Sequence, residues 1–173
     1  HFEPLLRRPF SFLRIRKSDE IIEVLFKTVG VGTGLLALAK PGDTLDILGP
    51  LGKTFDVPSS KKTVLLAGAG VGIPPMVAVA EDLKNSGHEI IPVLAGRTKS
   101  LVICTDDFKQ MGLIPEIATD DGSWGKQGLI TDRLMDIIAA RNLDQKPDEL
   151  MILGCGPQPM LTAVAELSMN GEG

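Results

Sequence analysis

The sequence has few cysteines and no excess of basic residues, and each shortage excludes a class of protein. It contains two cysteines in 173 residues, and neither stands in a paired metal-ligand spacing. This count favours a reduced, cytoplasmic protein over a disulfide scaffold. The formal net charge of −4 disfavours nucleic acid and anionic membranes as partners. No apolar run approaches the roughly 18 residues of a membrane helix, and no signal peptide is evident.

The most informative segment is a glycine-rich turn between a predicted strand and a predicted helix. An apolar run over residues 64–67 predicts a buried strand, and the glycines at 68, 70 and 72 allow a tight turn with free N–H groups. Pro74 and Pro75 favour the start of a helix. Free N–H groups at a helix N-terminus bind phosphate. We therefore predict a nucleotide site that uses Gly68, Gly70, Gly72 and Pro74, where a Cβ at Gly70 or Gly72 would intrude between amide and ligand.

This segment departs from the dinucleotide-binding fingerprint, which has a third glycine and an acid after the next strand. Ile73 takes the place of that glycine, and Gly96-Arg97 follows the next strand. An ordinary strand-to-helix turn therefore stays open as an alternative. Residues 150–160 repeat the order of strand, glycine turn, proline and helix. Two such turns at strand ends are typical of ligand sites in open α/β sheets.

The chain divides into two parts with different patterns. Residues 1–58 predict strands over Phe10–Arg16, Ile21–Val29 and Thr44–Leu48, with one helical turn over 35–39. Three strands cannot close a barrel, so this part is either an open sheet with bare edges or a barrel whose first strands are missing. We favour missing strands and expect both chain ends to be cut. Residues 59–173 alternate between strands (63–67, 89–95, 114–118, 150–153) and helices (75–85, 105–109, 131–141, 158–168). This alternation predicts a parallel sheet covered on both faces.

Five motifs in order identify a family. They are Leu-Arg-Arg-Pro-Phe-Ser at 6–11, Lys-Thr-Val-Gly-Val-Gly-Thr-Gly at 27–34, Gly-Pro-Leu-Gly at 49–52, Thr-Asp-Asp-Gly-Ser at 119–123 and Gly-Cys-Gly-Pro at 154–157. The set resembles the ferredoxin–NADP reductase superfamily over essentially the whole chain, and most of all its dihydroorotate dehydrogenase B electron-transfer subunits. The resemblance implies an incomplete antiparallel FAD-binding β-barrel over 1–58. A doubly wound parallel-sheet NAD(P)-binding α/β domain over 59–173 would follow it.

The resemblance also implies roles for individual residues. The dinucleotide phosphates would lie on Gly68 to Gly72 with Pro74, and Cys155, as the catalytic-site residue, would lie near the nicotinamide with Gly156 and Pro157. The alternative for Cys155 is a small buried hydrophobic residue after a core strand. The residues implied to line FAD are Arg8, Pro9, Phe10, Ser11, Leu25, Phe26, Lys27, Gly32 and Thr33.

The implied chemistry is hydride transfer between NAD(H) or NADP(H) and FAD, for which the protein supplies placement rather than an acid–base pair. Electrons would pass through a [2Fe–2S] cluster to an FMN-containing dehydrogenase subunit that handles dihydroorotate in pyrimidine biosynthesis. The family's four cluster cysteines have no counterpart here, so no metal ligand is assigned. Either truncation or a clusterless relative explains that absence.

Several alternatives stay open. A related electron-transfer subunit of a hydrogenase or of a ferredoxin:NADP transhydrogenase is one, although the Arg-Arg-Pro-Phe-Ser segment at 7–11 favours the dihydroorotate branch. A flavin-free nucleotide-binding regulatory module is another. Arg97 and Lys99 either bind the 2′-phosphate of NADP or are simply solvated. Asp120 and Asp121 either face the nucleotide or cap a loop.

Overall fold

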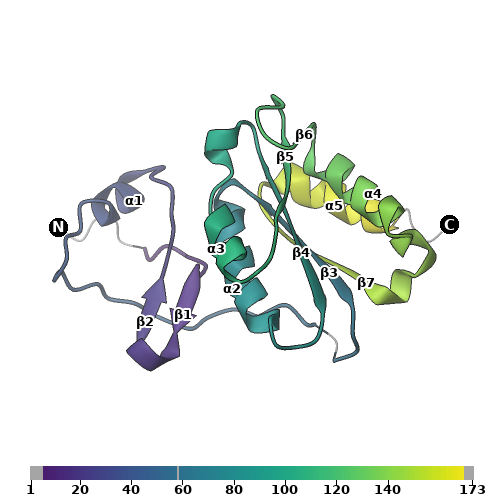
Figure 1. Cartoon of the computed structure of the whole chain (residues 1–173). Helices are drawn as coiled ribbons and strands as arrows, with labels where there is room; N and C mark the ends of the chain where they lie inside the picture. The colour runs from purple at the N-terminus through teal and green to yellow at the C-terminus, as the bar shows by residue number, and fades with distance from the viewer. Residues whose placement is uncertain (1–5, 58, 170–173) are drawn as a thin grey trace.

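A five-stranded parallel sheet forms the centre of the C-terminal part (Figure 1). The computed structural model describes residues 6–57 and 59–169. In the sheet the strand order is β6-β5-β4-β3-β7, and all neighbours are parallel. The strands are β3 (Thr63–Ala69), β4 (Glu89–Gly96), β5 (Glu116–Thr119), β6 (Lys126–Gln127) and β7 (Leu150–Cys155). The predicted parallel sheet is confirmed, and β6 is an addition to it.

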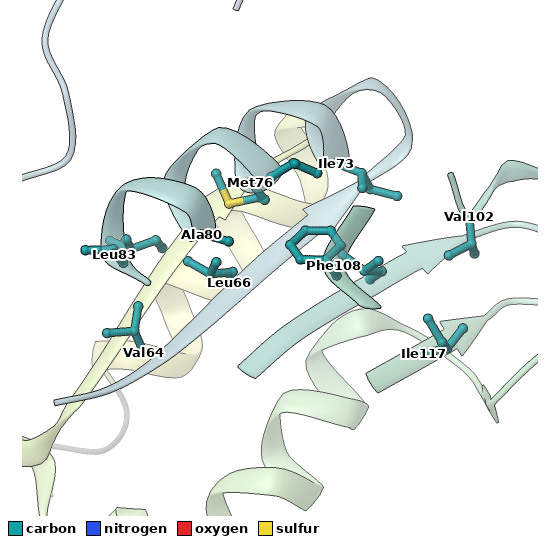
Figure 2. Close-up of a cluster of buried hydrophobic side chains, with 12 residues drawn as sticks. Val64, Leu66, Ile73, Met76, Ala80, Leu83, Val102, Phe108 and Ile117 are labelled. Carbon is teal, nitrogen blue, oxygen red and sulfur yellow. The ribbon is translucent and has the colours of Figure 1, made fainter. Parts of the chain in front are cut away.

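Helices cover both faces of this sheet because its strands alternate their buried side chains between two cores. Val64 and Leu66 point to the face covered by α2 (Ile73–Leu83) and α3 (Thr105–Gln110). Figure 2 shows Leu66 close to Met76 and Ala80 of α2. Leu65 belongs to the opposite core, under α4 (Ile130–Ala140) and α5 (Gln158–Met169). Five 3₁₀ turns complete the described chain: η1 (Lys17–Asp19), η2 (Gly70–Gly72), η3 (Lys99–Leu101), η4 (Leu143–Gln145) and η5 (Pro147–Glu149).

The N-terminal part contains much less regular structure than predicted. β1 (Arg14–Arg16) and β2 (Ile21–Glu23) form an antiparallel hairpin, and both are shorter than the predicted strands. The predicted strand over Thr44–Leu48 is wrong, because that segment has no strand partner and its Leu45 and Ile47 side chains are exposed. Among the described residues this part has a two-stranded sheet, so a barrel is not confirmed.

Helix α1 (Val31–Leu36) begins before the helical turn predicted over 35–39. Leu13 and Val57 of the N-terminal part pack against the core under α2 and α3. The predicted domain boundary falls on Pro58, which lies outside the described residues, and so the division stays a prediction. Across the two described ranges, no helix has the length and apolar character needed to cross a lipid bilayer.

Candidate functional site

The two glycine turns lie side by side at the carboxyl edge of the sheet. β3 pairs with β4 on one side and with β7 on the other, so the strand order reverses at β3. The register places Gly68 opposite Cys155, at the point where both strands end. Such a reversal point opens a crevice in which α/β sheets bind ligands. Two segments that are far apart in the sequence thus form one edge.

The first turn leaves room for a ligand at Gly70. This glycine has a φ of +56°, and a Cβ built on it would meet no atom within 4 Å. It opens η2, which continues directly into α2. Pro74 and Pro75 lack an N–H, so the free donors of this helix end must come from residues 70–72. These features fit a phosphate against the backbone of the turn.

Gly72 is held by a packing constraint that the sequence did not reveal, and its contact with a ligand stays a prediction. It is buried, and a Cβ on it would overlap the carbonyl group of Cys155 and lie 2.6 Å from the nitrogen of Gly156. Real Cβ atoms do not approach backbone atoms so closely, so only glycine fits here. The expectation that a Cβ at Gly72 would intrude on the ligand is therefore corrected: the side chain would strike the second turn instead.

The second turn lies close to the end of β3 and to the first residues of α5. A Cβ on Gly156 would lie 2.5 Å from the sulfur of Met160 and 3.4 Å from the Cβ of Ala69. After the turn, the carbonyl of Pro157 accepts a hydrogen bond from the N–H of Leu161 at 3.1 Å, at the start of α5. The second turn therefore packs between the end of β3 and the first residues of α5.

Cys155 is half-buried and packs against the core under α2 and α3. Burial raises the pKa of its thiol, so the side chain is a neutral thiol at pH 7 rather than a thiolate nucleophile. Hydride transfer requires no thiolate at this position. The packing agrees with the alternative of a small hydrophobic residue, and a nicotinamide contact stays a prediction.

The loops after β4 and β5 are hydrogen-bonded to each other at the carboxyl edge of the sheet. The N–H of Asp121 donates to the carbonyl of Arg97 at 3.2 Å, and the N–H of Lys99 donates to Ser123 Oγ at 2.8 Å. Ser123 Oγ in turn donates to Asp121 Oδ1 at 2.6 Å, and this bond is the main reason that the pKa of Asp121 is lowered. Asp121 therefore caps a loop, one of the two roles predicted for it.

No role was assigned from the sequence to Thr119, at the end of β5, or to Trp124 in the loop after it. Thr119 is fully buried, and its hydroxyl donates to the carbonyl of Trp124 at 2.8 Å and accepts from the Trp124 N–H at 3.0 Å. The ammonium of Lys99 lies 5.6 Å from the centre of the Trp124 ring, within the range of a cation–π contact. The chain's single tryptophan, directly after the Thr-Asp-Asp-Gly-Ser motif, was the available signal.

On the N-terminal part, two of the predicted flavin segments lie together. The rings of Phe10 and Phe26 are 5.9 Å apart at 66°, an edge-to-face contact between the 8–11 and 25–27 segments. The Arg8 guanidinium donates to the carbonyl of Leu6 at 2.6 Å, and both Arg8 and Lys27 are exposed. The remaining residues predicted on these two segments are Pro9, Ser11 and Leu25, and they lie outside the helices and strands.

The third predicted flavin segment lies in a helix. Gly32 and Thr33 lie inside α1, and the Thr33 hydroxyl accepts hydrogen bonds from the N–H groups of Val29 at 2.9 Å and Gly30 at 3.2 Å. Thr33 thus caps the first turn of the helix. Figure 1 shows α1 apart from the β1–β2 hairpin, and a site shared by Gly32 and Thr33 with Phe10 and Phe26 stays a prediction.

The cysteines do not form a metal centre. Among the residues that the structure describes, no three His, Cys, Asp or Glu side chains gather as metal ligands. Burial, with the Asp107 carboxylate adding to it, raises the pKa of Cys104 to about 11. Cys104 and Cys155 are both free. A cluster held by four cysteines cannot be placed on them.

Comparisons with known proteins agree with this geometry. A family model described as an oxidoreductase NAD-binding domain matches residues 66–166. The dihydroorotate dehydrogenase B (NAD(+)) electron transfer subunit of Bacillus caldolyticus is 39% identical over 170 residues, which are 97% of this chain and 63% of that protein. The corresponding subunit of Listeria monocytogenes is 36% identical over 92% of this chain and 60% of its own length. This chain therefore spans about three fifths of the curated relatives it matches.

Solved structures show the same fold. An NADH-dependent reduced ferredoxin-NADP oxidoreductase matches with a TM-score of 0.76 and 30% identity, over 95% of this chain and 56% of that one. A cytochrome P450 reductase from Amycolatopsis matches with a TM-score of 0.82 over 99% of this chain and 54% of that one. At 20% identity the second likeness concerns the fold alone.

Proposed function

The chain belongs to the oxidoreductase NAD-binding domain family, and from that premise we propose that it transfers electrons between a nicotinamide nucleotide and a partner flavoprotein dehydrogenase through FAD. The partner proposed is the FMN-containing catalytic subunit of dihydroorotate dehydrogenase, in a hetero-oligomer that serves pyrimidine biosynthesis. Support comes from 39% identity to an electron transfer subunit of that enzyme over 97% of this chain. The two free cysteines support a cytoplasmic location.

One observation carries the nucleotide half of this proposal: the glycine turns after β3 and β7 meet where the sheet order reverses. We propose that Gly68 and Gly70 place their backbone against the dinucleotide phosphates, while Gly72 and Pro74 shape the start of α2. In this arrangement Cys155, Gly156 and Pro157 border the nicotinamide. The open space beside Gly70 is the feature that admits the ligand.

The flavin half is proposed on the β1–β2 hairpin and its extensions. FAD, when bound, supplies the acceptor for the hydride of the reduced nicotinamide. The exposed Arg8 guanidinium suits a diphosphate, and the Phe10–Phe26 pair offers an aromatic surface beside it. Lys27 adds a second exposed cation to this surface. The protein's part is to bind and orient, and no proton relay is required.

A second function is favoured by one specific likeness. The NADH-dependent reduced ferredoxin-NADP oxidoreductase is 30% identical with a TM-score of 0.76, so a subunit of that type, or of a hydrogenase, is the alternative. The two functions share NAD(H) and FAD and differ in the partner. A flavin-free nucleotide-binding regulator is the third possibility, and it differs in lacking bound flavin.

The test is to reconstitute the chain with FAD and follow flavin bleaching on addition of NADH, alone and with candidate partners. We expect flavin to be retained through gel filtration and reduced by NADH. Co-purification with a dihydroorotate dehydrogenase catalytic subunit, and NADH formation from dihydroorotate by the pair, would support the first function. Pairing with a ferredoxin-dependent partner instead would select the alternative, and failure to hold flavin at all would leave the regulator.

A further inference from the structure

One arginine of the hairpin joins the two parts of the molecule. Arg14 begins β1, and its Nε donates to a Glu81 carboxylate oxygen on α2 at 2.6 Å, while a terminal nitrogen donates to Asp107 on α3 at 3.0 Å. Its other terminal nitrogen lies 3.5 Å from Glu23 on β2. Between the described ranges 6–57 and 59–169, every ion pair and hydrogen bond is made by Arg14. The polar link between the two parts is therefore a single side chain.

The chemistry of this link requires arginine. A guanidinium presents donors in a rigid fork, so three nitrogens can serve three carboxylates, which a lysine ammonium cannot match in geometry. The Arg14 side chain is 18% exposed, and the Glu81 and Asp107 side chains are 31% and 25% exposed. The hydrogen bond to Glu81 is the largest cause that raises the pKa of Arg14, so the charge is permanent. Without the Arg14 charge, the half-buried carboxylates of Glu81 on α2 and Asp107 on α3 would lose the cation that they share.

Arg14 also connects the two halves of the proposed site. The hairpin that it anchors continues into the segments of Phe10 and Phe26, and α2, which it binds at Glu81, begins at the glycine turn. Leu13 and Val57 add apolar contact to the same junction. Apolar contact is not directional, whereas three hydrogen bonds to three elements fix an orientation.

We infer that Arg14 is a positioning residue, which sets the hairpin bearing the proposed flavin site against the helix bearing the proposed nucleotide site. This inference rests on the proposed function. Hydride transfer requires reacting atoms held about 3–3.5 Å apart, so a small shift between two otherwise intact halves slows the step steeply. Loss of Arg14 therefore acts on the transfer rate rather than on the binding of either cofactor.

The first experiment compares Arg14→Met with Arg16→Met in the FAD-loaded full chain. Arg16 is a matched control, because it pairs with Glu23 inside the same hairpin and makes no ion pair with α2 or α3. In stopped-flow reduction by NADH, Arg14→Met should slow flavin reduction by roughly tenfold or more, with the NADH dissociation constant and flavin content within about twofold of the parent. Arg16→Met should reduce at nearly the parent rate. Equal rates in the two variants would overturn the inference.

A second measurement requires no flavin and separates this inference from the proposed function. Hydrogen exchange of the β1 and β2 amides should be faster in Arg14→Met than in Arg16→Met, because only the first variant releases the hairpin from α2 and α3. In a double-mutant cycle, Glu81→Gln should add little to the increase in exchange rate that Arg14→Met causes, because both substitutions remove the same Arg14–Glu81 interaction. If the parent chain holds no flavin, the proposed function fails while the hydrogen-exchange test still applies. Unchanged hydrogen exchange in Arg14→Met would show instead that Arg14 does not join the two parts.

Discussion

The backbone of Gly72 packs directly against the Cys155 carbonyl, so there is no space for a side chain between the start of α2 and the end of β7. This contact makes the two glycine turns one structural unit. A change at Gly72 would push the second turn away from the first, and any ligand that spans both turns would lose its site together with the packing.

We predict that Gly72→Ala destabilises the fold. The new methyl group would overlap the Cys155 carbonyl, and overpacking of this kind costs about 1–3 kcal/mol. Urea unfolding followed by circular dichroism measures the change. Gly34→Ala is the control, because a Cβ there meets nothing within 4 Å and lies inside α1, where alanine is preferred over glycine. A Gly72→Ala variant as stable as Gly34→Ala would contradict the contact.

We predict that Gly70→Asp weakens NADH binding more than Gly70→Asn does. Both side chains tolerate the positive φ of Gly70, and both enter open space, so their effects on folding should match. Only the aspartate brings a negative charge to the proposed phosphate position. We expect the NADH dissociation constant of Gly70→Asp to be about tenfold higher than that of Gly70→Asn, which corresponds to a loss of roughly 1.4 kcal/mol in binding free energy. Titration of the two variants beside their thermal melts is the measurement, and equal affinities would remove Gly70 from the site.

The strand-turn-helix units of the α/β part could be predicted from sequence because each is specified locally. Apolar runs such as 64–67 form strands, and prolines such as Pro74 favour helix starts. The two-residue β6 exists only because it pairs with β5, and its Lys-Gln sequence carries no apolar signal. The contact of Gly72 and the pairs of Arg14 depend on partners far along the chain, which no local pattern reveals.

The N-terminal part was predicted less well for a related reason. Thr44–Leu48 has the composition of a strand, but a strand forms only where a neighbour accepts its backbone hydrogen bonds. Thr33 was predicted to bind a ligand, and its hydroxyl is found to cap α1, a role that the sequence did not reveal because hydroxyls that suit an anion site suit helix caps equally well. Its ligand contact stays a prediction.

We predict that Cys104 makes stability fall at alkaline pH. Its thiol has a pKa raised from 9.0 to about 11 in the folded chain, mainly by burial. The folded state therefore keeps its proton where the unfolded state loses it, so the free energy of unfolding falls as the pH rises from 9 and levels off above 11. Thermal melts of the parent and of Cys104→Ala across this range measure the effect. The melting temperature of the parent should fall more steeply with pH than that of Cys104→Ala. Identical slopes would contradict the raised pKa of Cys104.

We predict that Arg8→Ala weakens FAD binding and that Arg7→Ala does not. Arg7 pairs with Asp46, whereas the Arg8 guanidinium has its one hydrogen bond in the described chain to the Leu6 carbonyl, which leaves further donors for a phosphate. A charge-assisted hydrogen bond of this type contributes about 1–3 kcal/mol, so Arg8→Ala should lose flavin during dialysis that the parent survives. Flavin fluorescence after dialysis gives the retained fraction. Full retention by Arg8→Ala, or equal loss by both variants, would exclude a specific role for Arg8 and would place the diphosphate elsewhere on the N-terminal part.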